Sequence, residues 1–212
     1  GLELLALRRG VGVLLLRRAR REELRERRER RVLHRRAHAV GQGGDEVDNV
    51  LGEGLIRGVT GIDWPRAAAV SLHNAIEERR PRYLVQGWFA VGDRSPEPDN
   101  QRGKSGSSTP AFALNDFYAA RLAAAAGKTD DAAMLLRRSG NWRNVWNPAA
   151  TSDGFTGFVM PRYPDGRFQP LDPKLGWDGK TYDNVGFYEG TAWVYSYAML
   201  HDIPGMIAAM GG

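Results

Sequence analysis

The chain has 212 residues, of which 42% are apolar, 30 are basic and 25 are acidic, and it contains no cysteine. A chain of this length and apolar content can bury a substantial core, which excludes a wholly disordered protein. Without cysteine there is no disulfide framework, no zinc–thiolate site and no thiol nucleophile. No apolar run approaches the roughly 18 residues that a membrane span needs, so we expect no membrane partner.

The excess of positive charge lies in the first 40 residues. They hold 13 arginines against five glutamates, whereas residues 41–212 hold 17 basic and 20 acidic residues. An arm that binds nucleic acid usually mixes lysine with arginine and adds aromatic residues that stack on bases, and this segment has neither. We therefore expect no nucleic-acid partner. We interpret residues 1–44 as an Arg/Leu-rich segment that is not native to the fold of residues 45–212.

The first globular elements are predicted to be helical. Residues 47–57 carry apolar side chains at helical spacing, and Pro65 suits the first turn of an Ala-rich helix that extends to about residue 78. Residues 80–108 read as a long connection. Within it, Gly103-Lys104-Ser105 resembles the end of a phosphate-binding loop, but Pro98 stands where that pattern requires glycine and no strand precedes it. We exclude a phosphate-binding loop.

The clearest predicted element is a helix over residues 109–126. Thr109 is placed to cap it, Pro110 to occupy its first position and Gly127 to end it. Ala119 and Ala123 form a strip small enough for a neighbouring helix to approach closely.

A second helix is predicted to follow from Thr129 to about residue 146, which completes an αα-hairpin. Two shorter helices are expected near residues 189–200 and 204–211, with Asp202 capping the last. An αα-hairpin is typical of helical repeats and of α/α toroids alike. Between these pairs, residues 147–188 are rich in Gly, Pro and aromatic residues, which either line a ligand site or anchor the loop.

Four stretches, in chain order, carry a resemblance to a known family. They are Asp48-Asn49-Val50-Leu51 with Gly61-Ile62-Asp63-Trp64; Ser107-Ser108-Thr109 with Asn115-Asp116-Phe117-Tyr118; Phe158-Val159-Met160-Pro161-Arg162 with Asp165-Gly166; and Phe187-Tyr188-Glu189-Gly190-Thr191-Ala192-Trp193 with His201-Asp202-Ile203-Pro204-Gly205. Together they make residues 45–212 resemble glycoside hydrolase family 92, the calcium-dependent exo-acting α-mannosidases.

The resemblance implies an (α/α)6 barrel that follows a β-sandwich, of which only part of the barrel is present here. The expected fold class is therefore all-α, an incomplete fragment of an (α/α)6 barrel, with exposed apolar surface where the rest of the barrel is missing. The implied substrate is an α-mannoside glycan, with α-1,2 linkages expected. The implied cofactor is calcium, with its ligands mostly outside this chain and no metal ligand assigned within it. The family also implies a secreted or periplasmic parent protein.

The same resemblance makes Glu189 the general acid, with Tyr188 and Trp193 as substrate-binding residues. An inverting glycosidase needs a second carboxylate as base, which the resemblance places beyond the end of this chain, so the fragment alone is expected to be inactive. The spacing by itself instead favours a first-turn glutamate that complements a helix dipole. Thr191 and Val194 depart from the polar residues usual in the family at those positions.

Two other classes of protein remain as alternatives. A non-catalytic helical-repeat binding module with a basic arm would need a repeat near 34 residues, and the predicted helical pairs share no residue pattern. Another α/α-toroid carbohydrate enzyme would differ from a mannosidase in metal dependence and sugar preference.

Overall fold

The computed structural model describes residues 47–77, 81–92, 104–176 and 186–212. By its contacts the chain divides into two compact units, residues 1–44 and 45–212, and all the described residues belong to the second. The Arg/Leu-rich segment, Trp177 and Tyr182 lie outside the described residues.

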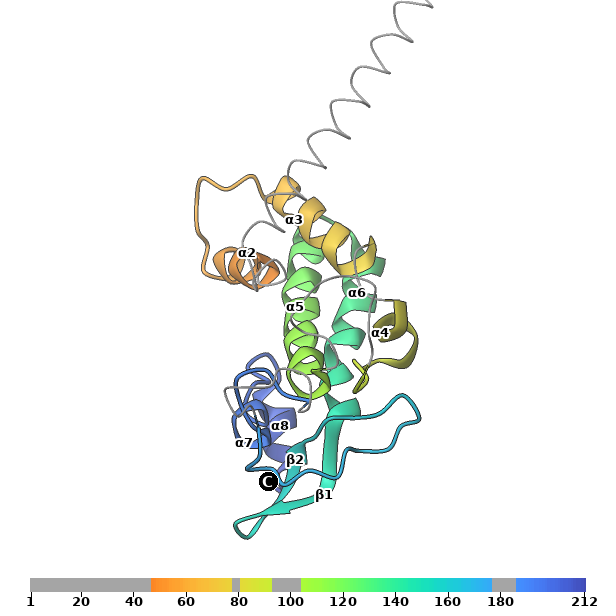
Figure 1. The fold of residues 1–212 in the computed structure, drawn as a ribbon. Helices are drawn as coiled ribbons and strands as arrows, with labels where there is room; N and C mark the ends of the chain where they lie inside the picture. Colours follow the sequence, from red (N-terminus) through yellow and green to blue (C-terminus); the bar gives the residue numbers. More distant parts are fainter. Residues whose placement is uncertain (1–46, 78–80, 93–103, 177–185) are drawn as a thin grey trace, which may run out of the picture. The chain divides into compact units, whose positions relative to one another are not determined.

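A long central helix, α5 (Ser105–Ala125), organises this unit, and other helices pack along it (Figure 1). Those that precede it are α2 (Val47–Ile56), α3 (Trp64–Leu72), which continues as a π-helical turn (His73–Glu77), and α4 (Pro81–Gln86). The helix α6 (Thr129–Arg138) runs back beside α5 and continues as a 3-10 helix (Ser139–Val145). The αα-hairpin is thus confirmed, although the α-helical part of its second arm is shorter than predicted.

Small residues bring these helices close together. Ala119 and Ala123 of α5 are completely buried against Ala75 and against Leu135 of α6, which confirms the predicted strip for close helix approach. On another side of α5, Gly52 of α2 lies against the ring of Tyr118, where a Cβ atom would overlap the ring. A larger residue at position 52 would therefore push α2 away from α5.

The start of α5 was mispredicted. The helix begins at Ser105, four residues before the expected Thr109 cap, and Pro110 lies inside it. The reason is tertiary: the hydroxyl groups of Ser105, Ser107 and Thr109 accept hydrogen bonds from main-chain N–H groups of other segments. These bonds stabilise an extra helical turn that the local cap signal does not predict.

The all-α prediction missed a β-hairpin. Strand β1 (Trp146–Ser152) pairs antiparallel with β2 (Phe155–Val159), with Trp146 opposite Val159 and Ser152 opposite Phe155. Asp153 and Gly154 connect the strands with φ angles of 51° and 82°, as a two-residue hairpin turn with both φ values positive requires. The Asp-Gly pair was the signal in the sequence that predicts this turn.

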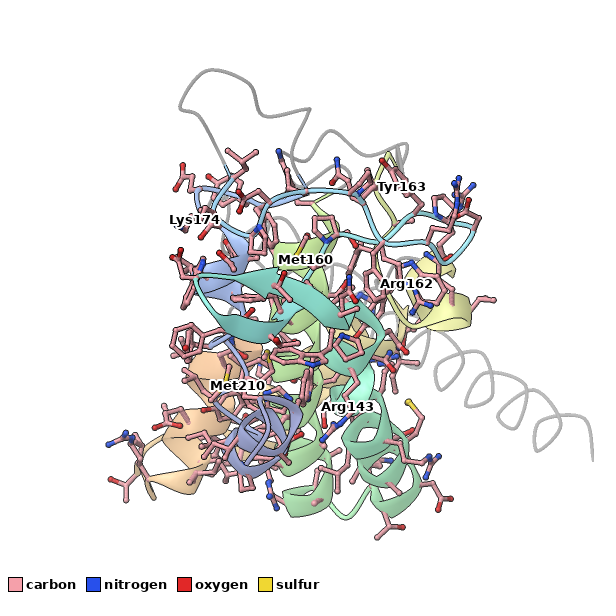
Figure 2. The ribbon with its side chains drawn as sticks, turned by 90° about the horizontal axis from the view of Figure 1, so that it is seen from below. Arg143, Met160, Arg162, Tyr163, Lys174 and Met210 are labelled. Carbon is pink, nitrogen blue, oxygen red and sulfur yellow. The ribbon has the colours of Figure 1, made fainter. Side chains whose placement is uncertain are left out.

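The largest buried cluster lies beneath the hairpin. It includes Trp142, Val145, Trp146, Phe158, Val159, Phe187 and Met199. Beyond β2, Arg162 lies with its guanidinium 4.5 Å from the ring centroid of Trp88 and 5.2 Å from that of Phe168 (Figure 2). Of the two interpretations of the aromatic residues in 147–188, the structure thus supports anchoring for Phe158, Phe168 and Phe187.

The chain ends in two short helices, α7 (Ala192–Tyr195) and α8 (Ile203–Ala209). The predicted helix over 189–200 is therefore reduced to one turn. The cap of α8 is confirmed, because the Asp202 side chain accepts a hydrogen bond from the Gly205 N–H at 3.1 Å. Large apolar residues on this part of the chain are exposed, as expected of a fragment: Val194, Tyr197, Leu200, Ile203 and Ile207.

Candidate active site

Glu189 lies in an exposed turn before α7, not in a helix. Its φ angle is 47°, in the left-handed region that residues other than glycine seldom adopt. Since α7 begins only at Ala192 and its cap is Thr191, Glu189 is not a first-turn residue. The alternative interpretation of Glu189 as a helix-dipole residue was therefore wrong, and a strained backbone at an exposed carboxyl group is consistent with a functional site.

The main chain of Tyr188, directly before Glu189, is held on both sides. Its N–H donates to Ser107 Oγ at 2.6 Å, and its carbonyl oxygen accepts from the Tyr195 hydroxyl at 2.5 Å. The Tyr188 side chain is partly buried. The main chain of Tyr188 is thus held by the first turn of α5 on one side and by Tyr195 of α7 on the other.

Trp193 is tied to the β-hairpin. Its indole N–H donates to Ser152 Oγ at 3.1 Å, and its ring lies edge-on to Phe155 and Phe158, with centroids 5.5 and 5.1 Å away. It is partly buried. The structure therefore gives this predicted substrate-binding residue an anchoring role between α7 and the hairpin.

The two departures from the family pattern lie at the same short helix, Thr191 at its cap and Val194 within it. Thr191 caps α7 without a side-chain hydrogen bond and forms an isolated β-bridge with Gly176. Val194 is 61% exposed. The exposed valine side chain offers no polar group at this position.

Sequence reasoning missed the importance of the first turn of α5. Ser105 Oγ accepts from the Arg162 N–H at 2.9 Å, and Thr109 Oγ1 accepts from the Phe89 N–H at 3.0 Å. With Ser107, these hydroxyls connect one helical turn to three separate loops. The run of hydroxyl residues from 105 to 109 was the available signal, and it predicted only a cap.

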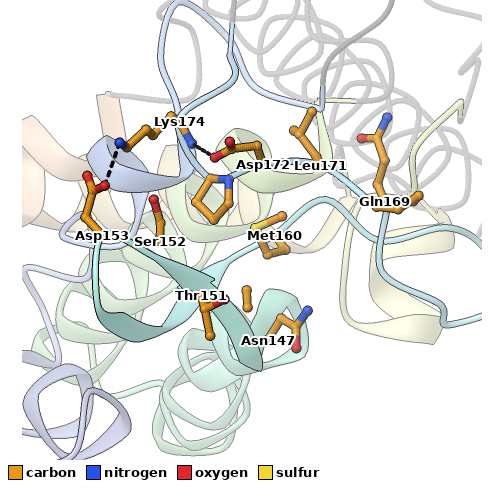
Figure 3. A pocket seen from close by; sticks show the side chains of 12 residues that line it. Asn147, Thr151, Ser152, Asp153, Met160, Gln169, Leu171, Asp172 and Lys174 are labelled. Atoms are coloured by element: carbon orange, nitrogen blue, oxygen red, sulfur yellow. Dashed lines mark hydrogen bonds and ion pairs between the residues drawn. The ribbon is translucent and has the colours of Figure 1, made fainter.

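A cavity of about 460 Å³ lies between the hairpin and the loop that follows β2 (Figure 3). Its lining includes Asn147, Ser152, Met160, Gln169, Asp172 and Lys174. Across it, Lys174 Nζ lies 2.6 Å from Asp153 Oδ1, and the hydrogen bond to Asp153 raises the pKa of Lys174. Both side chains are 54% exposed, so this ion pair adds little stability. Glu189 is not among the lining residues.

Within the described residues, no group of three or more His, Asp or Glu side chains lies close enough together to hold a metal ion. The described residues thus include no such carboxylate cluster for the calcium ion that the resemblance implies. None of the helices described here is both long and apolar enough to cross a membrane.

Comparison with known proteins establishes the family. Residues 25–212 match the Glycosyl hydrolase family 92 catalytic domain. This chain therefore belongs to glycosyl hydrolase family 92. A curated relative, described as an uncharacterized secreted glycosidase of Arthroderma benhamiae, is 27% identical over 194 residues, which are 81% of this chain and 25% of that protein.

Solved structures agree at the level of the fold. A family 92 inverting mannosidase of Bacteroides thetaiotaomicron superposes with a TM-score of 0.62 at 20% identity, over 82% of this chain and 22% of that one. A family 92 α-mannosidase of the same bacterium in complex with mannoimidazole gives a TM-score of 0.63 at 22% identity, over 78% and 20%. The chain thus spans a quarter or less of the relatives that it matches.

Proposed function

We propose that this chain is part of the catalytic barrel of an inverting exo-α-mannosidase and that Glu189 is its general acid. The family assignment makes the chain part of a glycoside hydrolase. The observation that carries the residue assignment is the turn at Glu189, where an exposed carboxyl group is held in a left-handed conformation. Strain of this kind persists only where the surroundings impose it, and it gathers at active sites.

The reaction requires two carboxyl groups with different tasks. A protonated acid gives its proton to the leaving oxygen, while a carboxylate about 6.5–9.5 Å away activates water on the opposite face of the sugar. We assign the first task to Glu189. The base, like the calcium ligands, would come from residues other than those described, because the chain spans only 20–25% of its relatives. The fragment alone is then inactive.

The expected substrate is an α-mannoside with an exposed terminal sugar, and α-1,2-mannobiose is the proposed test compound. Tyr188 and Trp193 would lie near that sugar, because they flank the acid in the chain. The relative described as secreted supports a secreted parent protein.

The test is release of mannose by a gene product that includes the catalytic domain at the length of its relatives. Activity would be measured with calcium, with chelator, and in the Glu189→Gln variant, which keeps the shape of the side chain and removes its proton-donating group. We expect calcium-dependent release to fall by roughly 10²–10⁴-fold in Glu189→Gln, the usual contribution of a general acid.

Asp130→Asn is the matched control, since Asp130 is an exposed carboxylate on α6 outside the proposed site. It should retain full activity. If a folded Glu189→Gln enzyme releases mannose at the rate of the parent, Glu189 is not the acid. If the folded parent cleaves no α-mannoside, the mannosidase assignment fails as a whole.

A further inference from the structure

The left-handed turn at Glu189 needs support from outside the turn. The residue is exposed, so its own side chain does not hold the backbone in place by burial. An L-residue at φ 47° returns to a less strained conformation unless its neighbours prevent it. The support must therefore come from groups that fix the adjacent peptide units.

Two side chains fix the two consecutive peptide units before Glu189, one on each side of the Tyr188 Cα atom. The carbonyl oxygen of Tyr188, which shares a peptide plane with the nitrogen of Glu189, accepts a hydrogen bond of 2.5 Å from the Tyr195 hydroxyl. The N–H of Tyr188 donates to Ser107 Oγ at 2.6 Å. Together these bonds hold the Tyr188 main chain in one orientation. The φ angle of Glu189 is the rotation about its N–Cα bond, and that nitrogen lies in the peptide plane that the Tyr195 bond fixes.

Both holding groups are themselves held rigidly. Ser107 lies in the first turn of α5 and is 6% exposed. The adjacent Gly106 donates its N–H to the Gly186 carbonyl at 2.8 Å, and a Cβ atom at position 106 would overlap the Phe187 ring. The first turn of α5 and the segment before Glu189 are therefore in direct contact over three consecutive residues.

Tyr195, the second holding group, is itself held by packing against Phe187. Its ring stacks on Phe187 with centroids 5.7 Å apart and 17° between the planes. Burial raises the pKa of Tyr195, a hydrogen bond with Ser107 opposes that rise, and the negative charge of Glu189 adds to it. The phenol therefore remains a donor at neutral pH, and its hydroxyl lies near both Ser107 and the candidate acid.

We propose that Ser107 and Tyr195 are positioning residues for the general acid, forming a clamp on the Tyr188 peptide that aims the Glu189 carboxyl group at the leaving oxygen. Neither residue donates the proton. This inference rests on the proposed role of Glu189 and extends it to two residues that lie on other elements. It predicts that loss of the clamp weakens acid catalysis while leaving sugar binding largely intact.

The dependence on the leaving group tests this directly. Alcohol departure from α-1,2-mannobiose needs protonation, whereas 2,4-dinitrophenolate leaves from 2,4-dinitrophenyl α-mannoside without it. In the calcium-loaded enzyme at the length of its relatives, Ser107→Ala and Tyr195→Phe should lower kcat for mannobiose by roughly tenfold to a hundredfold, with KM nearly unchanged. For the dinitrophenyl substrate the loss should be less than about threefold.

Ser107→Thr and Ser107→Val form a matched pair, because they add similar bulk and differ in the hydroxyl that accepts from Tyr188. The Thr variant should be more active on mannobiose than the Val variant. This comparison still decides the matter if Ser107→Ala folds poorly. Equal losses on both substrates, or equal activity of the Thr and Val variants, would mean that these residues only stabilise the fold and would overturn the proposal.

Glu189→Gln separates this inference from the proposed function. If Glu189→Gln loses activity on mannobiose selectively and the clamp variants do not, the clamp proposal fails and Glu189 remains the acid. If Glu189→Gln itself shows no dependence on the leaving group, the assignment of Glu189 fails first, and the clamp has no acid to position.

Discussion

Arg138 and Asp116 form a bidentate ion pair between α6 and α5. Arg138 Nε lies 2.6 Å from Asp116 Oδ2, and its Nη2 lies 2.7 Å from Oδ1. The aspartate side chain is fully buried and that of the arginine is 10% exposed. The same arginine also donates to the Ala75 carbonyl at 2.5 Å, and the Tyr83 hydroxyl donates to Asp116 at 3.2 Å. This network joins α4, α5, α6 and the middle of the π-helical turn.

Arg138→Ala should therefore destabilise the fold strongly. It removes the cation from beside a buried carboxylate, which typically lowers the free energy of unfolding by roughly 3–5 kcal/mol. Urea unfolding followed by circular dichroism measures the change. Arg137→Ala, at an exposed position on the same helix, is the control and should change stability by less than about 0.5 kcal/mol. Similar losses in the two variants would show that the buried pair has no special role.

Glu189→Gly should make the protein more stable and abolish the proposed catalysis. Glycine adopts positive φ without the steric penalty that a Cβ atom brings, so we expect a gain of roughly 1 kcal/mol in the free energy of unfolding. Glu189→Ala serves as the comparison, because it also removes the carboxyl group but keeps the Cβ atom. A gain of the same size in the alanine variant would show that backbone strain is not its source.

Asp202 links the cap of α8 to the 3-10 helix. Its side chain caps Gly205 and accepts from Arg143 at 2.7 Å and from Trp142 at 3.1 Å. Burial raises the pKa of Asp202, but the hydrogen bond and charge of Arg143 outweigh it, so that its pKa lies below the usual 3.8. The stability that this carboxylate contributes is thus fully present above pH 3.8 and is lost as the pH falls through the lower folded value.

Asp202→Asn should accordingly lower the free energy of unfolding by about 1–2 kcal/mol at pH 7. The difference between the variant and the parent should shrink as the pH is lowered below 4, where the parent carboxyl group also becomes neutral. Urea unfolding at a series of pH values measures this. A difference that stays constant down to pH 2.5 would contradict the ion-pair explanation.

His201 should also make stability depend on pH, because burial disfavours its charged form, whereas the charged form of Asp202 is stabilised by Arg143. Its Nε2 lies 2.9 Å from the Ser139 carbonyl oxygen, so this nitrogen carries the proton, and Nδ1 is buried without a hydrogen-bond partner among the described residues. Burial lowers the pKa of His201 below 6.5, although the Ser139 bond and the charge of Asp202 oppose that shift. Unfolding therefore takes up a proton just below pH 6.5, and stability falls as the pH is lowered.

His201→Gln retains an N–H group for the Ser139 carbonyl but does not take up a proton. Its free energy of unfolding should therefore decrease less between pH 7.5 and 5.5 than that of the parent. Parallel unfolding curves at both pH values measure the two slopes. Equal slopes would show that His201 does not titrate differently in the folded and unfolded states.

Several features could be predicted from the sequence because their causes are local. Pro65 and Asp202 mark helix starts, since a missing N–H and a capping carboxylate act within one turn. Ala119 and Ala123 indicate close helix packing because their size alone permits it. The motif around Glu189 also indicated the family, because it is a continuous stretch of the chain and can be read without the fold.

The conformation of the candidate site was decided by tertiary structure. The bond between Tyr188 and Ser107 joins residues 81 positions apart, and no short-range pattern in either segment encodes it. That bond and the one from Tyr195 place Glu189 in a left-handed turn where local propensity predicts the start of a helix. The sequence alone thus determined the family and the helical pair. Only the folded chain, through the hydrogen bonds of Ser107 and Tyr195 to the Tyr188 main chain, determined how the candidate acid is held.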